Sequence, residues 1–403
     1  MKTNNNIPAY RFQGYTDSWE LRKLGELTSY RNGKGYEDNQ SDFGKYELIN
    51  LNSISIEGGL KPSGKFINSA SETLNKNDLV MVLSDVGHGD LLGRVAIIPE
   101  DDRFVLNQRV ALLRNNDYAD CKYLFAYINA NQHYFKLQGA GSSQLNISKK
   151  AVENFVVHIP SQKEQSAIGT FFSTLDRHIT LHQRKLDTLK EQKKTYLKLL
   201  FPVKGQTKPA LRFQGFEDDW EEVKLGEVCT IQGGNAWKSD SYSLTGEYLV
   251  VTIANVTGEY FIDDKKGNRI DINPNEMQYV LKKGDILISL TGNVGRVSKM
   301  TESKGVLNQR VGKLTTTANF EFIFSILRTE KFENEMRLAS QGAAQANISN
   351  KDVLQYMIPL PTLPEQEAIG SFFSTLDQEI AQVEDKLASL KEMKKTLLRK
   401  LFV

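Results

Sequence analysis

The sequence predicts an α+β protein built by tandem duplication, with two globular modules and two long helices that pair antiparallel as a coiled coil. Three observations lead to this fold class. The chain of 403 residues repeats itself from end to end. The first part of each copy alternates short β-branched runs with turn residues, which is typical of strands. The last part of each copy carries apolar residues at heptad spacing, which is typical of a coiled-coil helix.

The repeat has one long period. RFQG begins at Arg11 and again at Arg212, and LNQRV begins at Leu106 and again at Leu307, in both cases at an offset of 201 residues. The string EQSAIGTFFSTLD recurs as EQEAIGSFFSTLD at the same offset. One offset over the whole length indicates the duplication of a large unit and excludes a solenoid of short repeats.

The globular part of each copy is expected to mix strands with one helical segment. Gly, Asn and Ser separate the β-branched runs, and an apolar helical pattern follows them at residues 118–136 and again at residues 320–338. The expected strands lie at residues 46–51, 79–83, 95–98, 248–253 and 285–290.

Each copy ends in a long predicted helix. The helix begins after Pro160 or Pro361, with Ser161 or Thr362 as the expected N-cap. Apolar residues then alternate four and three positions apart, which places them at the a and d positions of a coiled coil. These seam residues are Ile168, Phe172, Leu175, Ile179, Leu186 and Leu189 in the first helix, and Ile369, Phe373, Leu376, Ile380, Leu387 and Leu390 in the second.

The two helices are predicted to pack antiparallel. A parallel pair in register would set Lys193 beside Lys394, whereas an antiparallel pair faces each lysine with Leu376 or Leu175. The alternative, in which each helix packs only on its own module, stays open. At about 1.5 Å per residue, a helix from residue 168 to residue 200 is about 50 Å long, which matches about 15 base pairs of duplex.

These patterns divide the chain into five segments related by an approximate two-fold axis. The segments are a first module at residues 1–160, a first long helix at 161–201, a linker at 202–211, a second module at 212–361 and a second long helix at 362–403.

Composition indicates an ordinary soluble globular protein, with 40% hydrophobic and 25% charged residues and a net charge of +2. No apolar run approaches the ~20 residues of a membrane span, and the first residues do not resemble a signal peptide, so we expect a cytoplasmic protein that does not bind membranes. Cys121 and Cys229 lie far apart and outside any CxxC or histidine cluster, so neither a disulfide framework nor a metal site is expected.

The sequence argues against catalysis by this chain. The string nearest to an amino-methyltransferase motif, which begins at Asn273, lacks the second proline and the aromatic residue and is typical of a turn. The sequence has no GxxxxGK[ST] phosphate-binding loop. Residues 100–102 are an isolated acidic run, and the five histidines form no ligand pattern. We therefore expect no catalytic residue and no metal ligand in this chain.

In their order and duplication, these motifs resemble the specificity subunit of type I restriction-modification systems, over almost the full length. The resemblance is carried by Trp19 and Trp220 with the LGE string after each, by GDILIS from Gly284, by both Asn-Gln-Arg triplets and by the two EQxAIGxFFSTLD helices. It implies that each module is a target recognition domain that binds one half of an asymmetric bipartite site in double-stranded DNA. It also implies that the helices set the gap between the half-sites.

The resemblance implies partners and cofactors as well. Such a subunit docks two modification (methyltransferase) subunits, which methylate adenine with S-adenosylmethionine. The complex recruits restriction (translocase and nuclease) subunits, which use ATP and magnesium. This chain itself is then expected to be a non-catalytic subunit that holds no cofactor.

The first module departs from the family pattern at one turn. Asn77 stands where the second module has Gly284, and the loop before Gly93 is altered. This departure puts in doubt the transfer of loop contacts to the first module.

Residues that differ between the modules are the candidates for reading different half-sites. The divergence is strongest between residues 28–76 and residues 230–283, where amide, basic and aromatic side chains suit a DNA groove, although ordinary surface loops have a similar composition. The candidates are Arg31, Asn32, Lys34, Tyr36, Lys61 and Lys65 in the first module, and Gln232, Asn235, Trp237, Lys238, Lys265, Lys266, Asn268 and Arg269 in the second. Two polar runs add Ser142, Gln144, Gln341 and Gln345.

Residues that are identical in both modules are expected to support the scaffold or contact phosphate. These are Arg109 and Arg310 of the Asn-Gln-Arg triplets, and Arg94 and Arg296, each of which follows a glycine. Base contacts by the triplets remain an alternative, since amide and guanidinium groups pair with adenine and guanine edges.

Two classes of function remain at this point. The first is a DNA-recognition subunit that positions methyltransferase subunits on a split site. The second is a dumbbell-shaped adaptor whose modules bind proteins and no longer read DNA. The lysines of the helices fit either a solvated coiled-coil face or a docking surface for the partner subunits.

Overall fold

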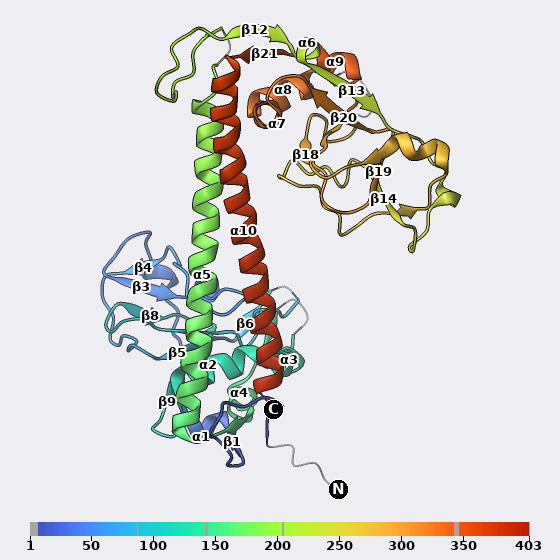
Figure 1. Cartoon of the computed structure of the whole chain (residues 1–403). Coiled ribbons are helices and arrows are strands. Elements are labelled where there is room, and N and C mark those ends of the chain that lie inside the picture. Colours follow the sequence, from blue (N-terminus) through green and yellow to red (C-terminus); the bar gives the residue numbers. More distant parts are fainter. Residues whose placement is uncertain (1–6, 87, 142–143, 204, 342–345, 403) are drawn as a thin grey trace. The chain divides into compact units, whose positions relative to one another are not determined.

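The computed structural model describes residues 7–86, 88–141, 144–203, 205–341 and 346–402, and its elements are labelled in Figure 1. The chain divides into two compact units, one made of residues 1–183 and 386–403 and the other of residues 184–385. Each unit therefore contains one module together with part of each long helix. No helix in the described ranges is long and apolar enough to cross a membrane.

The first module is built on a four-stranded antiparallel sheet with the order β2-β9-β5-β7. Its central strand β5 is buried on both faces. Leu79 and Met81 face the core that contains helix α2, while Val80 and Val82 face a second core with Ile49. The strands are β2 (Thr28–Asn32), β9 (Val110–Asn115), β5 (Leu79–Val82) and β7 (Val95–Ile97).

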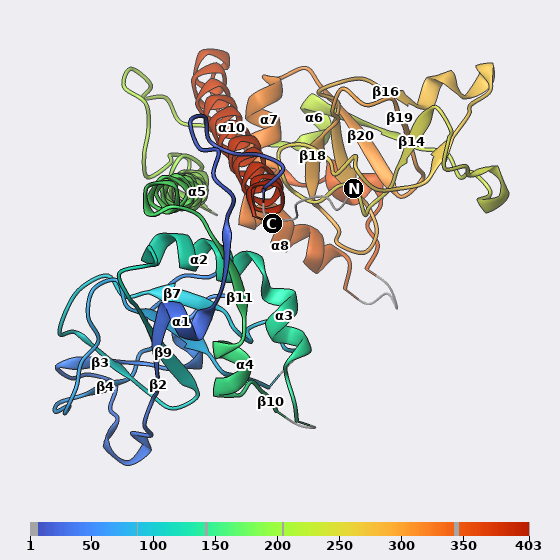
Figure 2. The same cartoon turned by 90° about the horizontal axis from the view of Figure 1, so that it is seen from below.

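Smaller elements complete this module, and Figure 2 shows α2 on one face of the sheet. A three-stranded sheet has the order β4-β3-β8, with β3 and β8 parallel, and β6 pairs with β10. These strands are β3 (Tyr46–Ile49), β4 (Phe66–Ile67), β8 (Phe104–Leu106), β6 (Ser84–Asp85) and β10 (Leu145–Asn146). The helices are α1 (Leu24–Leu27), α2 (Cys121–Ala130), α3 (Gln132–Leu137) and α4 (Lys149–Glu153), with short 3₁₀ turns η1 (Glu37–Asn39) and η2 (Leu51–Ser53).

The second module repeats this plan. Its sheets have the orders β13-β20-β17-β18 and β15-β14-β19-β16. The strands are β13 (Cys229–Gly233), β20 (Val311–Thr316), β17 (Ile286–Ser289), β18 (Val297–Lys299), β15 (Arg269–Ile270), β14 (Tyr248–Val251), β19 (Gly305–Leu307) and β16 (Val280–Leu281). The helices are α6 (Leu225–Val228), α7 (Phe320–Ile326), α8 (Glu330–Ala339) and α9 (Asn350–Leu354), with 3₁₀ turns η3 (Ser239–Ser241) and η4 (Pro274–Tyr279).

The sequence predicts one helical segment in each module, but the structure has two helices there, α2 and α3 in the first module and α7 and α8 in the second. In the first module Asn131 separates α2 from α3, and its amide donates a hydrogen bond to the carbonyl of Tyr127. In the second module Thr329 starts α8, because its hydroxyl accepts a hydrogen bond from the N–H of Phe332. The prediction of a continuous helix was wrong because side-chain caps interrupt an apolar pattern that otherwise continues.

The RFQG motif joins each module to its long helix. Arg11 forms a bidentate ion pair with the buried Glu164, with both nitrogen–oxygen distances at 2.7 Å, and Arg212 does the same with Glu365. A two-stranded ladder follows in each module, β1 (Glu20–Lys23) with β11 (Val156–Ile159), and β12 (Glu221–Lys224) with β21 (Met357–Leu360). The motif that opens each copy therefore has a structural role, because its arginine binds the module to a long helix.

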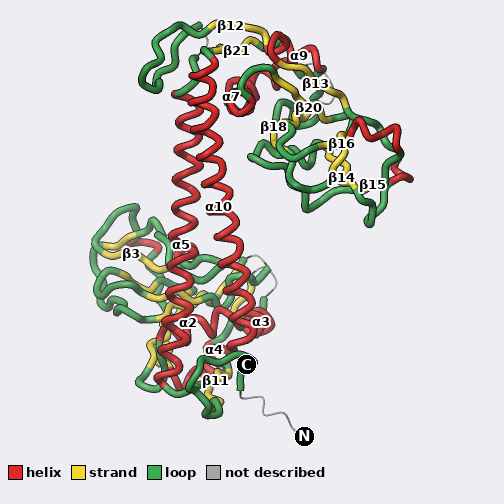
Figure 3. The backbone as a smooth tube through the Cα atoms, in the orientation of Figure 1, coloured by secondary structure: helices red, strands yellow, loops and turns green. Residues whose placement is uncertain are grey.

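The long helices are α5 (Gln162–Leu199) and α10 (Leu363–Leu401), which Figure 3 shows as unbroken. In the first unit Asp176 of α5 lies 2.6 Å from the ammonium of Lys394 of α10, and in the second unit Lys193 lies 2.6 Å from Asp377. Within each unit the early part of one helix thus meets the late part of the other, which confirms the antiparallel pairing and excludes packing of each helix on its own module alone.

Eleven of the twelve predicted seam residues are buried, and Ile179 is half-buried. The sequence named leucines opposite the two seam lysines. The structure instead pairs each lysine with the aspartate that follows that leucine, because an aspartate neutralises a lysine that the seam half-buries.

The turn at Asn77 keeps the conformation of its glycine counterpart. Asn77 has a φ of 70° and Gly284 a φ of 87°, and asparagine tolerates this left-handed region better than other residues with a Cβ. The departure at this position therefore leaves the backbone of the first module unchanged here.

We expect Asn77→Val to lower the free energy of unfolding by about 1–2 kcal/mol, because a β-branched residue is strained at positive φ. Asn77→Gly should be neutral or slightly stabilising. The side chain is exposed, so urea denaturation of the two variants reports backbone conformation with little change in packing. Equal stability of the Val variant and the parent chain would contradict the left-handed turn.

Candidate nucleic-acid interface

Each Asn-Gln-Arg triplet forms the turn that leads into the long strand of the main sheet. The amide side chain of Asn107 is buried, and its Oδ1 accepts a hydrogen bond of 2.8 Å from the N–H of Gln108. In the second module the Oδ1 of Asn308 accepts from the N–H of Arg310 at 3.2 Å. The asparagine therefore holds the turn, while the glutamine and arginine that follow it are exposed in both modules.

The most divergent segment of each module lies against this turn. Lys34 forms a parallel β-bridge with Asn107, and Asn235 forms the same bridge with Asn308. A glycine precedes each of these residues, because a Cβ on Gly33 or Gly234 would come within 1.8 Å or 2.3 Å of the asparagine carbonyl oxygen. Lys34 and Asn235 thus occupy equivalent places in one shared frame.

Other predicted residues lie at the same end of the sheet. The carbonyl of Arg109 accepts a hydrogen bond from the N–H of Leu83, and the carbonyl of Arg94 accepts one from Val82. The second module repeats both bonds with Arg310 and Arg296. The carbonyl of Arg310 accepts from the N–H of Leu290, and the carbonyl of Arg296 accepts from the N–H of Ser289. We call this end the sheet-end surface; it comprises residues 32–34, 94 and 108–109 in the first module and residues 233–235, 296 and 309–310 in the second.

Several first-module candidates are engaged within the protein. The Arg31 guanidinium pairs with Glu72, and the ammonium of Lys65 lies 2.7 Å from Asp42. Asn32 accepts a hydrogen bond of 2.6 Å from the hydroxyl of Tyr30, and Tyr36 packs on a small apolar core. Three of the candidates are exposed cations with no ion-pair partner among the described residues, namely Lys34, Lys61 and Arg109.

Second-module candidates divide in the same way. The Gln232 amide donates to the carbonyl of Gln278 at 2.8 Å, and Arg269 donates to the carbonyls of Gly246 and Glu247. The Trp237 indole N–H donates to Glu276 at 2.7 Å while its ring packs on an apolar core. The exposed candidates are Lys238, Lys265, Lys266, Asn268, Arg310 and Gln341.

The remaining candidates are placed differently. The Arg94 guanidinium donates to the carbonyl of Asn129 at 3.1 Å and lines a cavity of about 900 Å³ in the first unit. The side chain of Arg94 is half-buried, and this burial lowers its pKa. Arg296 and Gln144 are half-buried. Ser142 and Gln345 lie outside the described residues.

Glu276 accepts hydrogen bonds from several residues of the divergent segment of the second module. Its carboxylate accepts hydrogen bonds from the backbone N–H of Asn273 and the indole of Trp237, which lower its pKa, and from the amide of Asn235 at 3.4 Å. This contact places the Asn235 side chain beside an acceptor that stays ionised. The sequence analysis did not identify Glu276, because its partner Trp237 is 39 residues away in the chain.

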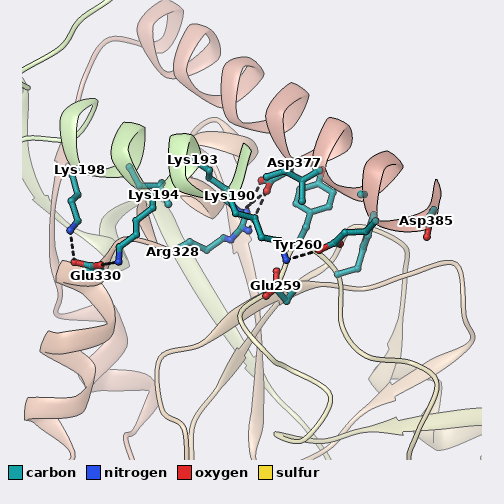
Figure 4. Close-up of a pocket in the computed structure, with 15 residues that line it drawn as sticks. Lys190, Lys193, Lys194, Lys198, Glu259, Tyr260, Arg328, Glu330, Asp377 and Asp385 are labelled. Carbon is teal, nitrogen blue, oxygen red and sulfur yellow. Dashed lines mark hydrogen bonds and ion pairs between the residues drawn. The ribbon is translucent and has the colours of Figure 1, made fainter. Parts of the chain in front are cut away.

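Charged residues of the long helices and the second module form a buried ion cluster where the two meet, drawn in Figure 4. Asp377 is 2% exposed and lies 2.6 Å from the nitrogens of both Lys193 and Arg328. Burial and the nearby Arg328 lower the pKa of Lys193 to about 8, despite the attraction of Asp377. The sequence analysis missed Arg328 and Asp377, although both copies of the FFSTLD motif end in this aspartate.

The helix lysines around this cluster are ion-paired. Lys190 pairs with Glu384 and Lys185 with Glu379, while Lys194 and Lys198 both face Glu330. These lysines are therefore engaged within the second unit. Among the described residues, no group of three or more His, Cys, Asp or Glu side chains is arranged to hold a metal ion.

Comparisons with known proteins find type I restriction-modification specificity proteins. A family model described as the type I restriction modification DNA specificity domain matches residues 16–191 and again residues 217–392. The chain is 26% identical over 404 residues to the type I restriction enzyme MjaVIII specificity subunit of Methanocaldococcus jannaschii, covering 95% of this chain and 91% of that one. It is 22% identical to a putative type I specificity subunit of Mycoplasma genitalium, covering 100% and 96%.

The fold has a solved counterpart. The crystal structure of a type I restriction-modification system S subunit from M. genitalium is similar with a TM-score of 0.70 at 19% identity, covering 98% of this chain and 99% of that chain. The likeness extends to both copies of the repeat.

Proposed function

The chain belongs to the type I restriction-modification DNA specificity family, whose domain it contains twice, and on that premise we propose that each of its modules reads one half of a split, asymmetric DNA site. The observation that carries this proposal is the sheet-end surface. The two modules present different side chains, Lys34 and Asn235, from the same backbone frame. Two equivalent frames with different polar tips are what the recognition of two different half-sites requires.

Exposed cations at the sheet-end surface support DNA as the ligand. Arg109 and Arg310 are exposed at equivalent turns, and guanidinium groups contact both phosphates and guanine edges. The net charge of +2 is small, so affinity has to come from local positive charge.

The long helices would set the gap between the half-sites. Their antiparallel pairing within each unit keeps each module attached to both helices. The same helices and the neighbouring modules would dock two modification subunits and, through the complex, the restriction subunits. We propose no catalytic step for this chain, since its role would be to position partners that carry the chemistry.

The test is a selection from a randomised duplex library by the chain in complex with its modification subunit. We expect a bipartite motif with two different halves and a fixed gap. Exchange of residues 28–76 for those of another specificity subunit should change one half alone. Enrichment of no motif would instead favour a protein-binding adaptor, and a change in both halves would contradict one module per half-site.

A further inference from the structure

We infer that the residue after the glycine shared by both modules, Lys34 in the first module and Asn235 in the second, selects one base of its half-site, guanine for Lys34 and adenine for Asn235. This inference rests on the proposed function and adds to it the identity of a specificity residue and the base that it reads.

Lys34 and Asn235 hold equivalent positions in the two modules. Both residues bridge the buried asparagine of the triplet turn, and both follow a glycine that cannot carry a Cβ without meeting that turn. The flanking residues of the turn are identical in the two modules. A difference in the base read at this point therefore has to come from positions 34 and 235, or from divergent neighbours.

Two pairs of divergent neighbours are engaged within the protein. Arg31 pairs with Glu72, and its counterpart Gln232 donates to the carbonyl of Gln278. Tyr36 and its counterpart Trp237 pack on apolar cores. Base contacts by these side chains would require breaking those interactions, whereas Lys34 is exposed and has no ion-pair partner among the described residues.

Asn235 keeps its pairing capacity despite its contact with Glu276. The amide Nδ2 carries two hydrogens and uses one of them toward the carboxylate at 3.4 Å. The second hydrogen and the Oδ1 remain, and together they match the N7 acceptor and N6 donor of adenine. Glu276 is then a positioning residue, because it orients the amide without contacting the base.

Lys34 has the opposite chemistry. An ammonium group donates hydrogen bonds and accepts none, so it matches the two acceptors of guanine, O6 and N7, and not the mixed edge of adenine. The same backbone position thus presents a donor-only group in one module and a donor–acceptor group in the other.

The test compares the motifs methylated by the full complex carrying the parent chain, Lys34→Asn or Asn235→Lys. We expect Lys34→Asn to shift one position of one half-site from guanine toward adenine by about ten-fold or more, and Asn235→Lys to make the reverse shift in the other half-site. Lys34→Arg should keep guanine, because arginine reads the same edge. Lys150→Asn, at an exposed lysine of α4 that is not among the candidate residues, should leave the motif unchanged.

The failures of the two proposals differ. A parent complex without a bipartite motif would refute the proposed function itself. A bipartite motif that is unchanged in Lys34→Asn, or that changes in the wrong half, would overturn the inference alone. If Lys34→Asn abolishes methylation, library selection by the same complex decides. Equal weakening at every sequence would assign Lys34 to a phosphate and overturn the inference, whereas an adenine at one position would support it.

Discussion

Asp377→Ala is expected to lower the free energy of unfolding by about 3–5 kcal/mol, because it leaves two buried cations without their counter-charge. Asp377 is 2% exposed, and the side chains of its partners Lys193 and Arg328 are 14% and 6% exposed. Denaturant unfolding of the variant and the parent chain measures the difference.

The duplication supplies a matched control for this substitution. Asp176 occupies the same position in the first copy, but its side chain is 29% exposed and pairs with Lys394, whose side chain is 24% exposed. Asp176→Ala should therefore cost about 1 kcal/mol or less. Equal losses for the two variants would mean that the buried cluster contributes no more than an accessible ion pair.

The loss caused by Asp377→Ala should also depend on pH. Lys193 has a folded pKa of about 8, below its ordinary value of 10.5, so the folded state binds fewer protons than the unfolded state between these values and this group adds stability as pH rises. Removal of Asp377 lowers the folded pKa further and extends that window downward. The difference in the free energy of unfolding between the variant and the parent chain should therefore become smaller as pH rises toward about 8. The share of that difference that comes from the unpaired Arg328 should persist, because the guanidinium keeps its proton.

Phe402→Ala is expected to destabilise the first unit by about 3–5 kcal/mol. Phe402 is 9% exposed and directly follows α10, and its ring centroid lies 5.0 Å from that of Tyr127 and 5.6 Å from that of Phe172. Truncation removes these aromatic contacts and leaves a cavity between the helix end and the module. Hydrogen exchange should show the loss of protection in residues 7–183 before it appears in residues 184–385.

Phe43→Ala is the control for Phe402→Ala. Phe43 is in the same unit but is 79% exposed, so its truncation should change stability by no more than about 0.5 kcal/mol. A comparable loss in both variants would indicate that the Phe402 contacts add nothing beyond the removal of an aromatic side chain.

Periodic features of this fold could be predicted from the sequence. The heptad of α5 and α10 and the β-branched run at β5 depend on local spacing, and a repeated string such as FFSTLD makes the duplication visible without structure. The direction of the helices also followed from the sequence, because Lys193 and Lys394 cannot share one level of a seam.

Pairings between distant residues could not be predicted in the same way. Arg31, like Lys34, is a cation and lies three residues before it. Only the fold brings Glu72 to Arg31, while Lys34 has no ion-pair partner in the part of the chain that the structure describes. The same holds for Trp237, whose indole is engaged by Glu276. The comparison of the two copies identified the loops that diverge. Which side chains in those loops are available to DNA depends on interactions with residues distant in the sequence, and no periodic pattern predicts these.

The way in which the two units share the helices has a consequence for synthesis on the ribosome. Residues 184–385 are continuous, so the second unit has all of its chain once residue 385 is added, whereas the first unit still needs residues 386–403. The N–H of Tyr10, for example, donates a hydrogen bond to the carbonyl of Lys400 at 2.9 Å. The module made first is thus completed last. Until then its apolar stripe on α5 stays uncovered, and nascent chains of this protein should depend on chaperones for longer than the order of their modules suggests.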